Sequence, residues 1–346
     1  MDRADRWLST RTFHHRQFAD IAALVRRKQA QGLRLSLVVP TLNEEQTIDT
    51  VLKRLLPLRD AVSLVDEIAV IDSGSTDRTV ERAGEAGAEV YRAADILPGM
   101  GAARGKGENL WKALHRLSGD ILVALDADIA NMHPRFVTGL VGPLLEHPEI
   151  GYVKACYDRP ACPDSGALGG GRVTELLIRP FFSLHFPELT GFIQPLAGEF
   201  AARRSLLETI PFPVGYGVEA AHLVDLHARH GLSIFAQSDL GQRLHRNRGN
   251  AELGRMACAI LQVVERRLHL RRGRPESTGP DCLIRQFVRR GDTFAAVSFA
   301  IDEQERPPML TVAAYRHQRM MRDGRQDRPR ILAAHPIEAA AATAEE

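Results

Sequence analysis

The sequence predicts an α/β fold built on a mostly parallel sheet. Three apolar runs, at 34–40, 66–72 and 120–126, have the length and the composition of buried strands. Segments with apolar residues at helical spacing separate these runs. Strands that alternate with helices of about 10–15 residues are typical of a doubly wound sheet, whose ligands bind beyond the carboxyl ends of the strands. The segments that follow the three runs are therefore expected to meet in one crevice.

Two helices are expected after the first two strands. The first has apolar residues at helical spacing over 48–56, and Asn43 is its expected N-cap. The second is expected to be capped by Ser75 and to stop at Gly87. A short strand is expected at 88–91 and a loop at 92–105. A helix at 106–119 and the strand at 120–126 follow.

The second half of the chain is less regular. A glycine-rich loop there runs into a helix at 165–182. We expect a strand followed by a helix at 198–212 and a single helix at 216–231. A strand with a basic loop is expected at 232–248, and a long helix at 252–270. The sequence shows no internal repeat, so one continuous domain with a C-terminal extension fits the pattern best.

The composition excludes several classes of protein. Of 346 residues, 44% are hydrophobic and 25% are charged, which is ordinary for a globular protein, and the net charge of +2 does not indicate nucleic-acid binding. No apolar run approaches the roughly 18 residues that span a bilayer, and the first 20 residues lack the apolar core of a signal peptide. We therefore expect a cytoplasmic protein without a membrane partner. The four cysteines have no CxxC spacing, which favours reduced thiols over structural zinc.

Two aspartates at the end of the strand 120–126 carry the strongest chemical signal. Asp126 and Asp128 flank Ala127, and residues two apart on a strand point to the same face, so their carboxylates would repel each other unless a cation lies between them. A divalent cation that also binds a substrate's phosphates suits such a pair. A solvated turn with two aspartates is the alternative.

A lysine at a helix start is the second signal. Lys106 lies between Gly105 and Gly107, where glycines allow close approach of a ligand and a helix N-terminus favours anions. Only five of the 45 basic residues are lysines, which makes this one more notable. The spacing is not that of a Walker A loop, and a glycine turn with a solvated lysine is the alternative.

Two further basic segments lie in the second half. Arg172 and Thr174 follow a run of three glycines at a helix start and could bind a phosphate or a carboxylate, although a flexible linker with an N-cap is equally compatible. His245 lies among arginines in "RLHRNR" and is either a metal or phosphate ligand or, from the residues alone, a surface residue.

These segments together resemble a known family. "VVPTLNEEQTI", "VIDSGSTDRT", "RGKGENLWKAL" and "LDADIANMHP" are similar to the nucleotide-sugar domain of GT-A (Rossmann-like) glycosyltransferases. "GGGRVTEL", "QPLAGEFAARR", "PFPVGYGVEAAHLVD" and "LGQRLHRNR" narrow the resemblance to the glucosyl-3-phosphoglycerate synthases. These are retaining enzymes that transfer glucose from UDP-glucose to 3-phosphoglycerate. The match spans roughly residues 34–260 in unbroken order.

The resemblance implies a role for each matching residue. The nucleotide would be bound by Pro40, Thr41, Leu42, Glu44, Ser73, Lys106, Asp126 and Ala127. Asp128 would ligate the metal directly, and His245 would complete the site, with Mg²⁺ as the expected ion and Mn²⁺ as a possible one. The 3-phosphoglycerate would be held by Gly171, Arg172, Thr174 and Asn247. Glu219 would join Asp126 and Asp128 as a catalytic residue that contacts the sugar or the acceptor.

The resemblance also divides the chain. We expect a helical N-terminal arm at 1–33 and a GT-A domain at 34–250, whose nucleotide-sugar half is 34–130 and whose acceptor half is 131–250. A helical arginine-rich extension at 251–334 and a disordered tail at 335–346 are expected to follow. The arginines after residue 243 form either a solvated face or an oligomer contact, and we expect a homodimer.

The expected activity is transfer of glucose from UDP-glucose to the 2-hydroxyl of 3-phosphoglycerate. Retention needs either a covalent intermediate or same-face attack, and the latter is favoured because no carboxylate stands out as a nucleophile. Thr41 and Ala127 replace residues common in the family, alanine and serine, which leaves the donor open to GDP-mannose or ADP-glucose. An inverting transferase acting on polyprenyl phosphate and an inactive nucleotide-sugar-binding regulator are the more distant alternatives.

Overall fold

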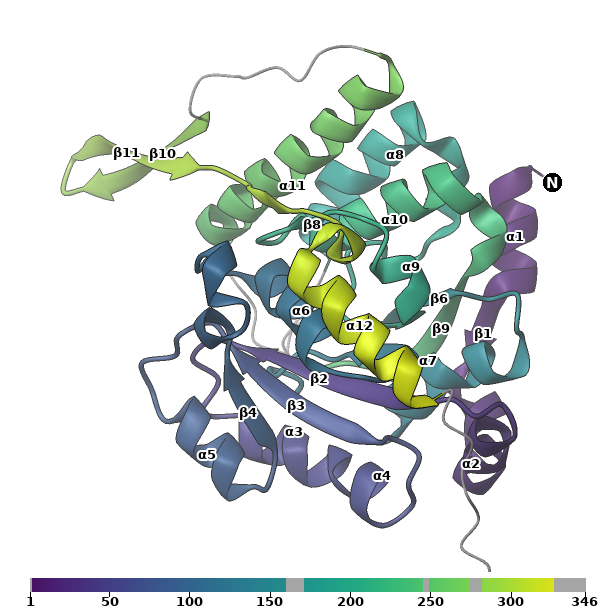
Figure 1. Cartoon of the computed structure of the whole chain (residues 1–346). Helices are drawn as coiled ribbons and strands as arrows, with labels where there is room; N and C mark the ends of the chain where they lie inside the picture. The colour runs from purple at the N-terminus through teal and green to yellow at the C-terminus, as the bar shows by residue number, and fades with distance from the viewer. Residues whose placement is uncertain (1, 160–170, 245–248, 274–281, 327–346) are drawn as a thin grey trace, which may run out of the picture.

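A computed structural model describes residues 2–159, 171–244, 249–273 and 282–326 (Figure 1). Within them, the central sheet has eight strands in the order β1-β9-β6-β7-β5-β2-β3-β4. β7 is antiparallel to both neighbours, and the remaining pairs are parallel. The predicted mostly parallel α/β sheet is confirmed. The strands are β1 (Thr12–His14), β2 (Leu35–Thr41), β3 (Glu67–Asp72), β4 (Glu89–Arg92), β5 (Ile121–Ala124), β6 (Tyr152–Asp158), β7 (Phe200–Arg203) and β9 (Phe235–Gln242).

A hydrophobic core lies on each face of the sheet. Successive side chains of β2 alternate between them, since Leu37 and Val39 belong to one core and Val38 belongs to the other. The first core is covered by α2 (Ile21–Ala30), α3 (Ile48–Leu55), α4 (Pro57–Asp60), α5 (Thr79–Glu85) and α7 (Arg135–Glu146). The second is covered by α6 (Lys106–Arg116), α8 (Arg179–His185), α10 (Val218–His230), α11 (Asn250–Arg271) and α12 (Ala313–Gln326).

Shorter segments connect these elements. They are η1 (His15–Phe18), η2 (Ala93–Asp95), η3 (Pro98–Met100), η4 (Thr174–Ile178), η5 (Pro187–Gly191), α9 (Arg204–Leu207), η6 (Leu232–Ile234) and η7 (Met309–Thr311). The segment η4 is a π-helix, a form that occurs frequently at functional sites.

The N-terminal arm is helical only in part. Between α1 (Arg3–Arg11) and η1 it forms β1, which pairs in parallel with β9 and is the edge strand on that side of the sheet. The Trp7 indole N–H also donates a hydrogen bond to the Phe235 carbonyl at 3.1 Å. The arm therefore belongs to the packed domain.

Two predicted helix starts are wrong. α3 begins at Ile48, and Asn43 has a φ of 58° and accepts a hydrogen bond from the Thr76 N–H, so it joins two loops and caps no helix. α5 begins at Thr79, whereas the Ser75 hydroxyl donates to the Asp72 carboxylate. The Ser75 hydroxyl also accepts a hydrogen bond of 2.8 Å from the Asn43 N–H, so bonds between the two strand-end loops replace the expected local caps.

The C-terminal extension was predicted to be helical, and this is correct only in part. Between α11 and α12 the chain forms a hairpin of β10 (Cys282–Arg290) and β11 (Thr293–Ile301), which projects from the body of the molecule (Figure 1). Two further residues, β12 (Glu305–Arg306), pair with β8 (Phe212–Pro213). The alternating side chains of β11 gave a strand pattern that the high arginine content of the region obscured.

None of the described helices is long and apolar enough to cross a membrane. The predicted ligands His245 and Asn247, and the predicted tail 335–346, lie outside the described residues.

Candidate active site

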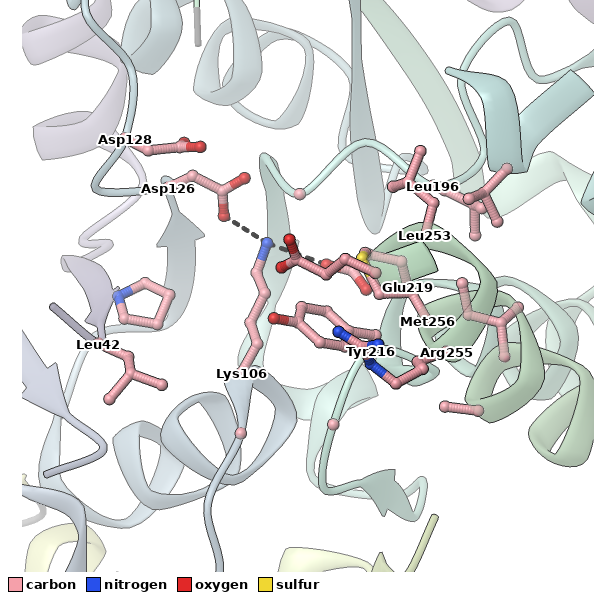
Figure 2. Close-up of a pocket in the computed structure, with 18 of the residues that line it drawn as sticks. Leu42, Lys106, Asp126, Asp128, Leu196, Tyr216, Glu219, Leu253, Arg255 and Met256 are labelled. Carbon is pink, nitrogen blue, oxygen red and sulfur yellow. Dashed lines mark hydrogen bonds and ion pairs between the residues drawn. The ribbon is translucent and has the colours of Figure 1, made fainter. Parts of the chain in front are cut away.

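The ends of three parallel strands meet at one cavity. Pro40, Ser73 and Asp126 lie at the carboxyl ends of β2, β3 and β5 and line a cavity of about 720 Å³. Figure 2 shows Asp126 and Asp128 on one side of this cavity and Glu219 with Met256 across from them. The crevice expected beyond the sheet edge is therefore present, and segments of the second half enclose it.

A cation does lie between the two aspartates, and it belongs to the protein. The Arg243 guanidinium is 3.0 Å from an Asp126 oxygen and 2.7 Å from an Asp128 oxygen. Arg243 directly follows β9, and its side chain is only 3% exposed. The sequence reasoning missed this residue, although an arginine directly after the strand was a usable signal.

Lys106 forms a second link between opposite walls of the cavity. Its ammonium group contacts the Asp126 carboxylate and lies 2.9 Å from an oxygen of Glu219 (Figure 2). The flanking glycines have a packing reason, because a Cβ at Gly107 would lie 1.7 Å from the Pro213 carbonyl oxygen. They let the start of α6 approach the segment before α10, whereas the sequence had suggested approach of a ligand.

The ion pairs determine the charge states of these groups. Burial opposes the charge on Lys106, but the Asp126 and Glu219 carboxylates outweigh it and raise the pKa of the ammonium. Burial likewise disfavours the Asp126 carboxylate, yet Lys106 and Arg243 outweigh it and hold its pKa well below the usual range. Lys106 and Asp126 therefore both stay ionised at neutral pH.

Glu199 lies behind this cluster and was also missed. It is fully buried, lies 2.9 Å from Arg243 and accepts a hydrogen bond of 2.7 Å from the Tyr157 hydroxyl. Burial raises the pKa of its carboxyl. An acid directly before the apolar strand β7 is the signal that the sequence offered. Glu199 therefore anchors Arg243 and also lies beside the Asp126 carboxylate.

The residues expected around the nucleotide base gather at one end of the cavity. Pro40, Thr41, Leu42, Glu44 and Ser73 all line it. The Thr41 hydroxyl donates to Asp72 at 3.1 Å, and the Ser73 hydroxyl donates to Asn109 at 2.8 Å. The first bond joins the ends of β2 and β3, and the second joins the end of β3 to α6.

The residues expected around the acceptor line another part of the same cavity. Gly171, with a φ of 83°, precedes Arg172 and Thr174, and all three are lining residues. That φ lies in the left-handed region, which favours glycine. The Arg172 guanidinium donates to the Asn250 side chain at 2.5 Å. The structure thus brings the described acceptor residues and the aspartate pair to one cavity.

The donor set suits a hard divalent cation. Within the described residues, no group of three or more His, Cys, Asp and Glu side chains is placed to hold a metal ion. The Asp126 and Asp128 carboxylates are oxygen ligands of the type that Mg²⁺ and Mn²⁺ prefer, and both line the cavity. The residues present therefore fit such an ion, with His245 as the further predicted ligand.

Comparisons with known proteins agree with this geometry. The model of Glycosyl transferase family 2 matches residues 36–210. Over 309 residues the chain is 49% identical to a glucosyl-3-phosphoglycerate synthase of Petrotoga mobilis, covering 88% of this chain and 95% of that protein.

Solved structures are also similar. The mannosyl-3-phosphoglycerate synthase of Rubrobacter xylanophilus has a TM-score of 0.82 and 36% identity, covering 89% of this chain and 99% of that one. The glucosyl-3-phosphoglycerate synthase of Mycobacterium tuberculosis, in complex with Mn²⁺, UDP-glucose and phosphoglyceric acid, has a TM-score of 0.77 and 42% identity, covering 87% and 98%. Another structure of that protein contains Mg²⁺ and UDP. With a GT-A sheet, an aspartate pair at its edge and relatives matched over most of their length, this chain belongs to the glucosyl-3-phosphoglycerate synthase family of the family 2 glycosyltransferases.

Proposed function

We propose that this chain transfers glucose from UDP-glucose to the 2-hydroxyl of 3-phosphoglycerate, with retention and with Mg²⁺ or Mn²⁺ as cofactor. The observation that carries the proposal is that the aspartate pair, the segment 40–44 and Arg172 line one cavity. The 49% identity to a glucosyl-3-phosphoglycerate synthase supports the choice of donor and acceptor.

The nucleotide-sugar would lie along the sheet edge. Asp128, with His245, would hold the metal ion, which when bound supplies positive charge against the diphosphate leaving group. Lys106 at the N-terminus of α6 would add a second positive charge there, which a helix N-terminus reinforces. The base would be held by the segment 40–44 and by Ser73.

The acceptor would lie next to the sugar. The Arg172 guanidinium and the helix start at Thr174 would bind the phosphate or the carboxylate of 3-phosphoglycerate, together with Gly171 and Asn247. The Glu219 side chain is only 8% exposed and points into the cavity, where it would accept a hydrogen bond from a sugar or acceptor hydroxyl.

Same-face attack is the favoured route to retention. The carboxylates of Asp126, Asp128 and Glu219 each form an ion pair with Lys106 or Arg243. A carboxylate so engaged is a weak nucleophile, so a covalent intermediate on one of them is disfavoured.

Turnover assays with labelled donors test the proposal. Purified protein is incubated with 3-phosphoglycerate and UDP-glucose, GDP-mannose or ADP-glucose, with and without Mg²⁺. We expect Mg²⁺-dependent formation of glucosyl-3-phosphoglycerate from UDP-glucose. Binding of UDP-glucose without turnover of any donor would instead favour an inactive nucleotide-sugar-binding regulator.

GDP-mannose is the second candidate donor. The specific observation in its favour is the higher TM-score to the mannosyl-3-phosphoglycerate synthase, 0.82 against 0.77. Faster turnover of GDP-mannose than of UDP-glucose would replace the donor while leaving the acceptor and the metal site unchanged.

We also propose that the chain forms a homodimer through the hairpin. Leu283, Phe287 and Phe294 are 62%, 67% and 63% exposed on one face of the hairpin, whereas Gln286 on its other face bonds to α11, so the apolar face is open to a second copy. Light scattering after size-exclusion chromatography should give twice the monomer mass. Phe287→Ser should shift it to the monomer, whereas Met320→Ser on α12 should not. A monomeric wild-type protein at micromolar concentration contradicts the proposal.

The cytoplasm is the proposed compartment. The buried thiol of Cys156 is free, as is usual in a reducing environment. Fractionation of the producing cells would test this.

A further inference from the structure

A short segment after the hairpin crosses over the start of α10. We name residues 302–306 the C-terminal strap. Its last two residues, β12, pair with β8, and the Gln304 carbonyl accepts a hydrogen bond of 2.9 Å from the Val214 N–H. The strap is tied to α11 as well, because the Gln262 amide accepts a bond of 3.1 Å from the Glu303 N–H. It therefore links α11 to the segment 212–217.

Within the strap, Glu303 points at the turn that leads into α10. Its carboxylate accepts a hydrogen bond of 2.5 Å from the Gly215 N–H and a further one from the Gly217 N–H. Glu303 is only 6% exposed, and it lines the active-site cavity. A Cβ at Gly215 would lie 2.6 Å from the carboxylate, so a larger residue there would displace the Glu303 side chain. The Glu303 carboxylate and the Gly215 backbone are therefore in direct contact.

The same turn supports two charged residues of the cavity. The carbonyls of Val214 and Gly215 accept hydrogen bonds from the Glu108 and Gly107 N–H groups, at 2.9 and 3.3 Å, directly after Lys106. At its other end the turn leads to Glu219, the second residue of α10. A displacement of the turn would therefore change the ion pair between Lys106 and Glu219.

We propose that Glu303 is a positioning residue for glycosyl transfer, whose carboxylate holds the turn 215–217 and thereby sets the relative position of Lys106 and Glu219. This inference rests on the proposed function, and it gives the C-terminal region, which carried no recognisable motif, a role at the site. Tyr216, in the middle of the turn, also lines the cavity, so the same contact sets the shape of that wall.

The charge state of Glu303 changes near neutral pH. Burial raises the pKa of its carboxyl to about 7, with a further increase from Glu305, while the Gly215 and Gly217 N–H groups and Arg266 act in the opposite direction. The ionised form is the stronger acceptor for two N–H groups. The turn is therefore held more firmly as the pH rises through about 7.

Two substitutions at Glu303 and one matched control test the proposal. Glu303→Ala removes the acceptor, Glu303→Gln keeps an acceptor oxygen without titrating, and Glu305→Gln makes the same change two residues away, where the carboxylate pairs with Arg266 and Arg267. For each we would measure kcat from pH 5.5 to 8.5, the dissociation constant of UDP with Mg²⁺, and hydrogen exchange of the amides at 213–217.

The expected results separate positioning from general stability. Glu303→Ala should lower kcat at pH 8 by about 10- to 100-fold, as small misplacements do, with UDP affinity within about two-fold of wild type. Glu303→Gln should lack the rise in kcat that wild type shows near pH 7. Glu305→Gln should keep this rise, displaced to lower pH because the Glu305 charge no longer raises the pKa of Glu303. Amides at 213–217 should exchange faster in Glu303→Ala than in Glu305→Gln.

Two results would overturn the inference. The first is a Glu303→Gln enzyme that keeps the wild-type kcat and its rise near pH 7. The second is unchanged exchange at 213–217 in Glu303→Ala. Wild-type protein that fails to transfer glucose would instead contradict the proposed function, and the exchange experiment would still decide whether Glu303 holds the turn.

Discussion

The carboxyl edge of the sheet and the C-terminal region support one cavity in different ways. At the sheet edge, Pro40 and Asp126 reach the cavity directly, because each lies where a parallel strand ends. In the C-terminal region, Glu303 and Arg306 contact the segments that carry Lys106 and Glu219. The first region supplies chemical groups, and the second holds other groups in place. Changes in the first should therefore affect chemistry and ligand binding, and changes in the second should affect stability and geometry.

The largest effect is expected for Asp128→Asn at the sheet edge. Loss of a metal-ligating charge removes several kcal/mol of transition-state stabilisation, so kcat should fall by about 100-fold or more while the fold remains intact. Steady-state kinetics with Mg²⁺ and circular dichroism measure the two quantities. Asp60→Asn, at a carboxylate that pairs with Arg59 on the surface, is the control. Undiminished Mg²⁺-dependent turnover in Asp128→Asn would rule out the metal role.

Arg306→Met in the C-terminal strap should lower the stability of the fold and leave ligand binding intact, the opposite of Asp128→Asn. Arg306 forms two bonds, of 2.6 and 2.8 Å, to Glu108, whose side chain is fully buried. Removal leaves that carboxylate with Lys112 at 3.7 Å, so urea denaturation should show a loss of about 3 kcal/mol. UDP affinity should stay unchanged. The exposed Arg316→Met serves as the control, and wild-type stability with weakened UDP binding would break the distinction between the two regions.

Nucleotide protection sharpens the description of the sheet edge. UDP with Mg²⁺, at about 100 times its dissociation constant, should stabilise the protein by about 2.7 kcal/mol, because it binds only the native state. GDP and ADP should protect less, since backbone groups at 40–44 and the short Ser73 side chain leave little room for a purine. Thermal unfolding measures the shift, and Arg306→Met should show the same UDP shift as wild type. Stronger protection by GDP or ADP would overturn the donor base.

The narrowest effect, confined to one substrate, is expected for Arg172→Ala, at the acceptor side. Loss of a hydrogen bond to a charged group costs on the order of 1.5–3 kcal/mol, so the KM for 3-phosphoglycerate should rise by roughly 10- to 150-fold. The KM for UDP-glucose should barely change. Arg179→Ala, which breaks a surface pair with Glu175, is the matched control. An equal rise in both KM values would mean that Arg172 supports the fold.

The local patterns of the sequence were sufficient for the sheet edge. Apolar runs and their ends predicted β2, β3 and β5, and placed Asp126 and Asp128 in the crevice, because strand identity and strand ends depend on neighbouring residues. The caps at Asn43 and Ser75 failed for a tertiary reason. The Asn43 side chain accepts from the Thr76 N–H and the Ser75 hydroxyl accepts from the Asn43 N–H, so each bonds a loop more than 30 residues away in the sequence.

Only the tertiary structure decided which charges meet. Arg243 reaches Asp128 across 115 residues of sequence because the strand order brings β9 and β5 to one sheet, and Glu303 reaches Gly215 across 88 residues. Ion pairs and hydrogen bonds depend on separation in space, which strand order determines and sequence spacing does not. The sequence by itself determined the elements, the strand-end carboxylates and the family resemblance. The packing of distant segments determined the partners of those carboxylates and how the C-terminal strap holds the turn beside them.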